Sequence, residues 1–154
     1  MKVFNMDDNE IYMREAAKMA RKAAKKDEVP VGAVVVHSGR IISRAHNLRE
    51  TKKDPLAHAE IIAIRKAARN LHGWRLEGCI LYVTLEPCPM CAGAIVISRI
   101  DQVVFGAYDP KAGAFGSLYD LAEGKLNHRP KVTGGVLKDE CAKLLKDYFA
   151  AKRS

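Results

Sequence analysis

Apolar residues follow two kinds of spacing in the first third of the chain. One set recurs every three or four positions and predicts an amphipathic helix over residues 7–26. The continuous, mostly β-branched run at residues 31–36 is instead typical of a strand that is buried on both faces. A turn at Ser38-Gly39 would then lead into residues 41–45, the second strand of a hairpin. The helical set is Tyr12, Ala16, Met19, Ala20 and Ala23.

The rest of the chain alternates between helix and strand patterns. This order predicts two β-α-β units, and open α/β sheets place their sites beyond the carboxyl ends of the strands, where the helices begin. One domain over residues 1–154 is expected. The predicted segments are a polar loop at 47–57, a helix at 58–71, a strand at 79–85, a helix that starts after residue 87, a strand at 103–107, an irregular stretch at 108–130 with a short helix at 118–122, a strand at 131–137 and a last helix at 138–151.

Composition narrows the class of protein. With 154 residues, 48% of them hydrophobic, the chain can bury one compact core. It has no signal-peptide pattern and no apolar run long enough to span a bilayer, and its four cysteines do not form a disulfide framework, so we expect a cytoplasmic protein without a membrane partner. The net charge of +8 suits a polyanionic partner such as nucleic acid, although a solvated surface accounts for it equally well.

Two short motifs contain the candidate chemistry, His58-Ala59-Glu60 and Pro87-Cys88-Pro89-Met90-Cys91. One imidazole and two thiols are the three protein ligands of a catalytic zinc site, in which the fourth position is left to water. Glu60 would then lie beside the ion, where a carboxylate can transfer protons to a substrate. His-x-Glu followed by Pro-Cys-x-x-Cys is the signature of zinc-dependent nucleobase deaminases.

A structural zinc site in an RNA-binding subunit is the alternative from a different class. Structural sites usually have four Cys or His ligands, but Cys79 and Cys141 each stand alone in apolar surroundings and form no second pair. That interpretation also leaves Glu60 without a role. The catalytic interpretation is therefore favoured.

Beyond the zinc motif, the chain resembles the bacterial tRNA-specific adenosine deaminases, a family with the cytidine deaminase fold. The zinc motif is shared by many deaminases, whereas the segments after Val104 point to the tRNA enzymes. The segments that show the resemblance are residues 29–34, 47, 54–60, 82–88, 90–94, 98–100, 104–107, 116–118, 127–129 and 140–141.

The resemblance implies an α/β fold, a three-layer α/β/α sandwich with a five-stranded mixed sheet. It implies a homodimeric hydrolase that binds a tRNA anticodon arm, deaminates the wobble adenosine to inosine and releases ammonia. One zinc ion per subunit and no organic cofactor are expected. Carried over by position, His58, Cys88 and Cys91 bind the zinc, Glu60 is the proton shuttle, and Asn47 hydrogen-bonds the flipped base.

Other positions keep two interpretations. Asn47 could bind the base, or it could be an ordinary loop asparagine whose side chain hydrogen-bonds its own backbone. Asp109 could accept a hydrogen bond from a ribose 2′-hydroxyl or belong to an ordinary turn. His128 and Arg129 could contact RNA or be loop residues without a special role.

A guanine deaminase, or another deaminase of free nucleobases or nucleotides, shares the zinc motif and Asn47. The basic charge and the segments after Val104 favour the tRNA enzymes.

Overall fold

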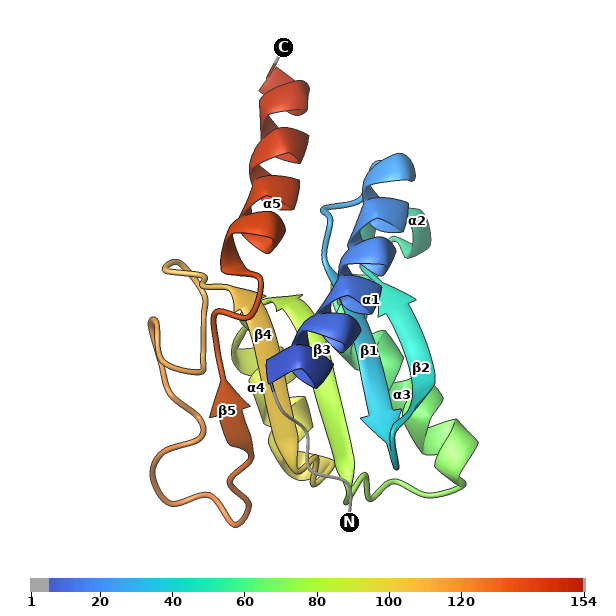
Figure 1. Cartoon of the computed structure of the whole chain (residues 1–154), viewed down its shortest axis with the longest axis vertical. Coiled ribbons are helices and arrows are strands. Elements are labelled where there is room, and N and C mark those ends of the chain that lie inside the picture. The colour runs from blue at the N-terminus through green and yellow to red at the C-terminus, as the bar shows by residue number, and fades with distance from the viewer. Residues whose placement is uncertain (1–5, 154) are drawn as a thin grey trace.

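A computed structural model describes residues 6–153 as a five-stranded sheet with helices on both faces (Figure 1). The strand order is β2-β1-β3-β4-β5; β1 is antiparallel to β2 and β3, while β3, β4 and β5 are parallel. The mixed sheet expected from the resemblance is thus confirmed. The elements are α1 Met6–Lys25, β1 Gly32–His37, β2 Arg40–His46, α2 Arg49–Lys52, α3 Ala59–Leu71, β3 Cys79–Leu85, α4 Pro89–Ile97, β4 Gln102–Ala107, β5 Lys131–Thr133 and α5 Lys138–Arg153.

Three layers result because the central strands are apolar on both faces. Val34 and Tyr82 belong to a core cluster on the α1 face of the sheet, whereas the alternate residues Val35 and Val83 belong to a cluster with α3 and α4. Figure 1 shows α1 in front of the sheet and α3 and α4 behind it. Within residues 6–153, every helix is either too short or too polar to cross a membrane.

The sheet and α1 approach each other closely at Gly32. A Cβ atom there would lie 2.1 Å from the backbone oxygen of Ala16 and 2.4 Å from the backbone nitrogen of Ala20. Only glycine allows the helix to pack this near the start of β1. The close contact holds α1 against the start of β1, and the residue before it, Val31, accepts a hydrogen bond at 3.0 Å from the backbone nitrogen of Asn47, the candidate base ligand.

Three local predictions differ from the structure. Residues 118–122 form turns and one isolated bridge between Phe115 and Asp120 instead of a helix. The backbone nitrogens of Leu118, Tyr119 and Leu121 donate to the oxygens of residues 113 and 114, so they are not available for helical hydrogen bonds. The predicted last strand stops at Thr133, since the following Gly134-Gly135 pair turns the chain, with φ at 84° for Gly135. The polar loop before His58 contains the four-residue helix α2. A helix of about one turn is too short to leave a periodic pattern of apolar residues in the sequence.

Candidate functional site

The candidate ligands occupy the starts of two helices at one end of the sheet. His58 is the N-cap of α3 and Cys88 the N-cap of α4, and both have extended backbone angles. Pro89 is the first residue of α4, where its fixed φ suits a helix start and its missing N–H is not needed. The two β-α-β connections therefore bring both motifs to the carboxyl end of β3, as the sequence predicted.

The three ligand atoms form one cluster. The Nδ1 atom of His58 lies 3.7 Å from the sulfur of Cys88 and 3.5 Å from the sulfur of Cys91. All three atoms lie within 4.8 Å of one another, and among the described residues this is the only group of its kind that could hold a metal ion. Cys91 is buried, whereas His58 and Cys88 are half-buried, so an ion here would face the solvent on one side.

The pKa values of the two thiols in this cluster are shifted in opposite directions. A hydrogen bond from the Cys91 thiol, with a smaller contribution from His58, lowers the pKa of Cys88 to about 4. The same hydrogen bond and burial raise the pKa of Cys91. The Cys88 thiolate in turn raises the pKa of His58. One thiolate is thus already favoured at the helix start, and a bound cation would favour the second.

Glu60 lies in the first turn of α3, with only 4% of its surface exposed. Burial raises the pKa of its carboxyl to about 7, and the charge of Cys88 adds to this effect. The side chain also makes a hydrogen bond with Cys91, which places it directly beside the ligand cluster. A carboxyl group that titrates near neutral pH can both accept and donate a proton, as a general acid–base must.

A cleft of about 230 Å³ opens above this cluster. It is somewhat smaller than the roughly 300–1,000 Å³ of pockets for drug-sized ligands, which suits one planar ring system. The surface that its wall exposes is mostly apolar, although half of the lining residues have polar side chains that can fix the orientation of a ligand. The lining residues are Val29, Val31, Asn47, Arg49, His58, Ala59, Glu60, Leu85, Glu86, Cys88, Asp109 and Ala112.

Asn47 lines this cleft and is buried. Its amide nitrogen donates to the backbone oxygen of Val29 at 3.3 Å, and its side-chain oxygen accepts from the backbone nitrogen of Arg49 at 3.0 Å. The amide therefore bonds to its own loop and also faces the cleft. Both interpretations of Asn47 fit this position, and its contact with a base stays a prediction.

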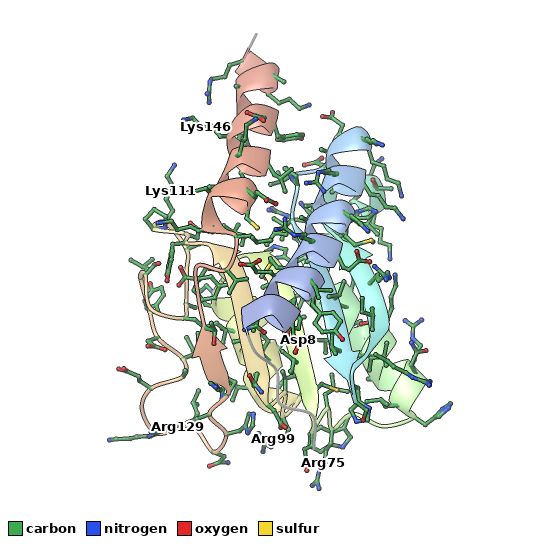
Figure 2. All side chains as sticks on the ribbon, viewed as in Figure 1. Asp8, Arg75, Arg99, Lys111, Arg129 and Lys146 are labelled. Carbon is green, nitrogen blue, oxygen red and sulfur yellow. The ribbon has the colours of Figure 1, made fainter. Side chains whose placement is uncertain are left out.

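The other three predicted contact residues lie in two different places. Asp109 lines the cleft, and its carboxylate also accepts hydrogen bonds from the backbone of Lys111 and Ala112 in a turn. His128 lies 2.6 Å from the backbone oxygen of Ile100, just before β4 begins, and Arg129 donates to the backbone of the loop before it. Figure 2 shows Arg129 at the end of the sheet away from Lys111. The structure therefore does not bring His128 and Arg129 to the cleft.

Two buried carboxylates were not singled out as functional from the sequence. Glu28 accepts hydrogen bonds from the backbone nitrogens of Glu50 and Thr51, at 3.0 and 2.7 Å, and from the Thr51 hydroxyl at 2.6 Å. It holds α2, and with it Arg49, in the wall of the cleft. Glu86 holds the opposite wall in a similar way. The sequence offered one signal for both residues: each is an acidic residue at the edge of an apolar run, just before a segment that contains a proline.

Comparison with known proteins places this geometry in one family. The family model of MafB19-like deaminases matches residues 6–153. The chain is 55% identical to the tRNA-specific adenosine deaminase of Bacillus subtilis, over 96% of this chain and 92% of the relative.

Solved structures show the same similarity. One from a study of A-to-I editing by tRNA:A34 deaminases at the wobble position of transfer RNA has 45% identity and a TM-score of 0.84, over 88% of this chain and 99% of the other. A guanine deaminase from Nitrosomonas europaea has 28% identity and a TM-score of 0.78, over 92% of this chain and 84% of the other. Identity is thus lower to the guanine deaminase than to the tRNA enzymes.

Proposed function

Because the chain belongs to the tRNA-specific adenosine deaminases, we propose that it hydrolyses the wobble adenosine of a tRNA anticodon to inosine and releases ammonia. The observation that best supports this proposal is the placement of Glu60. Its buried carboxyl lies beside the His58, Cys88 and Cys91 cluster in a cleft of about 230 Å³ that suits a single base.

We propose that the cluster binds one zinc ion per subunit. Around a tetrahedral zinc ion with the usual bond lengths, an imidazole nitrogen and a thiolate sulfur lie about 3.6 Å apart. The separations of 3.7 and 3.5 Å from His58 Nδ1 to the two sulfurs fit this value. Imidazole and thiolate together are also a ligand set that zinc prefers. When bound, zinc lowers the pKa of a water molecule so that it can act as the nucleophile near neutral pH.

In the proposed reaction Glu60 moves the protons. Its carboxylate accepts a proton from the attacking water and delivers it to N1 of adenine, while the new bond forms at C6. It then takes the proton of the hydroxyl now on C6 and gives it to the amino group. The C6–N bond breaks, ammonia leaves, and C6 keeps its oxygen as the carbonyl of inosine. Asn47 would hold the edge of the base, and Asp109 would accept a hydrogen bond from the ribose.

The substrate we propose is an anticodon loop, acted on in the cytoplasm. A base stacked inside a helix cannot enter the cleft, whereas a single-stranded loop already presents unstacked bases. Arg49 lines the cleft, and the whole chain has a net charge of +8, which favours contact with phosphates. A free nucleobase such as guanine is the second candidate, because the fold is shared with a guanine deaminase.

The test is to sequence tRNA that carries adenosine at the wobble position after incubation with the zinc-loaded protein. Inosine is read as guanosine, so we expect conversion at that one position. Ammonia release from guanine, cytosine and free adenosine is measured in parallel. Release from guanine without conversion of the tRNA would contradict the proposal and support the second candidate.

We also propose a homodimer in which α4 meets a second copy of the chain. The outer face of α4 is apolar, with Met90, Gly93, Ala94 and Ile97 spaced as one helical stripe. Ile97 is 69% exposed, although the inner face of the same helix is already buried. A helix that is apolar all round is expected to be covered on both sides.

Introducing a charge into this stripe should separate the subunits. Ile97→Glu would bury an unpaired carboxylate in the interface, so we expect the mass in solution to fall from that of two chains to that of one. Light scattering coupled to size-exclusion chromatography measures this. Ile11→Glu, at another exposed apolar residue, is the control and should keep the wild-type mass. A wild-type protein of single-chain mass would contradict the homodimer.

A further inference from the structure

Glu86 is an acidic residue in a place where acids are rare. It follows β3 directly, precedes the Pro87-Cys88 pair and has only 2% of its surface exposed. It also lines the cleft. A buried carboxylate is tolerated only when hydrogen bonds replace the water that it has lost. The partners of Glu86 therefore show which part of the structure depends on it.

All of these partners come from one loop, residues 109–117. One carboxylate oxygen accepts from the backbone nitrogen of Asp109 at 3.0 Å and from the Ser117 hydroxyl at 2.5 Å. The other accepts from the backbone nitrogens of Phe115 and Ser117, both at 3.1 Å. Burial by itself would raise the pKa of Glu86, but these hydrogen bonds lower it below the ordinary value. The carboxylate form is thus the one that the loop binds.

The 109–117 loop packs closely around the Glu86 carboxylate. A Cβ atom on Gly113 would lie 2.3 Å from the Glu86 carboxyl carbon, so only glycine fits there. The backbone nitrogen of Ala114 donates to the Pro87 oxygen at 2.8 Å, which joins the loop to the residue beside Cys88. Asp109 and Ala112, from the same loop, line the cleft opposite α2. Glu86 thus fixes the shape of this wall of the cleft, of which its own side chain is a part.

We propose that Glu86 is a positioning residue for the nucleotide: it holds the 109–117 loop as one wall of the cleft. This inference rests on the proposed function, because the substrate held by the wall is the RNA nucleotide. Glu86 transfers no proton and need not contact the base. Its loss should weaken substrate binding much more than the chemical step, which distinguishes it from Glu60.

The substitution Glu86→Gln tests this at nearly constant volume. A carboxylate accepts four hydrogen bonds here, but an amide has only one acceptor oxygen, and its NH₂ group would face a backbone N–H in either orientation. We expect the loop to leave the wall and the KM for tRNA to rise about 10- to 100-fold, the size expected when buried donors lose their acceptor. The kcat should change by less than about threefold, and the zinc content should stay at the wild-type value.

Three further variants separate this role from a general loss of folding. Ser117→Ala removes one of the four hydrogen bonds at an exposed residue and should raise KM by a few-fold. The double variant should have the KM of Glu86→Gln alone, because both changes act on one network. Glu77→Gln, at an exposed acid, is the control and should keep the wild-type KM.

The outcomes are distinct. Partial unfolding would lower the fraction of active enzyme, and hence kcat, with KM unchanged; that result, or loss of zinc, would overturn the inference. If Glu86→Gln does not fold, Ser117→Ala decides, and an unchanged KM there would overturn it. A wild-type protein that leaves tRNA unconverted would instead overturn the proposed function, and this inference with it.

Discussion

Replacing Glu60 by glutamine is expected to lower kcat for tRNA deamination by about 10²- to 10⁴-fold, the contribution typical of a positioned general acid–base. Glutamine has almost the same volume and can occupy the same buried place in α3. It cannot, however, accept a proton from water and return it to the leaving amine. The chemical step should therefore fail in a protein that still folds and still binds its substrate.

Single-turnover measurement of inosine formation, with the zinc content determined on the same sample, checks this expectation. Glu123→Gln changes an exposed acid and should keep wild-type activity. If Glu60→Gln deaminates at the wild-type rate while the zinc is retained, the proton shuttle is assigned to the wrong residue. Loss of zinc would point instead to a ligand role for Glu60.

Replacing Cys91 by alanine is expected to remove both the bound metal and the activity. Cys91 is fully buried and its sulfur lies 3.5 Å from the Nδ1 atom of His58, so its loss leaves only two of the three proposed ligands. Even residues that only support metal ligands change affinity about 10- to 100-fold, and loss of a ligand should have a larger effect. We expect kcat/KM to fall by at least about 10³-fold. The purified variant should contain less than about one zinc ion per ten chains.

Elemental analysis and the sequencing assay measure the two effects together. Cys141→Ala is the matched control, because Cys141 is equally buried but lies on the α1 face of the sheet, away from the cluster. It should lose some stability and keep its zinc. Stoichiometric zinc in the Cys91→Ala variant would contradict the three-ligand site, and zinc missing from the wild-type protein would contradict a zinc enzyme altogether.

The fold was predictable wherever one local pattern dominates. The apolar run of β1, the helical spacing in α1 and the alternation that follows gave the central elements, because burial on two faces or on one face leaves a periodic trace in the sequence. The 108–130 segment left no such trace. Its path depends on Gly113 and Gly116 and on hydrogen bonds to distant groups, so a short helix was wrongly predicted at residues 118–122.

For the site, residue identity and spacing alone were enough to nominate His58, Cys88, Cys91 and Glu60. Imidazole, thiolate and carboxylate groups are the ones that a catalytic zinc site uses. His58 and Glu60 lie at the start of one helix, and Cys88 and Cys91 lie at the start of another. The walls of the cleft were decided only by the tertiary structure. Glu28 reaches Thr51 and Glu86 reaches Ser117, pairs that are 23 and 31 residues apart. A hydrogen bond between a side chain and a remote backbone leaves no periodic pattern, because it exists only after the sheet has brought the two segments together.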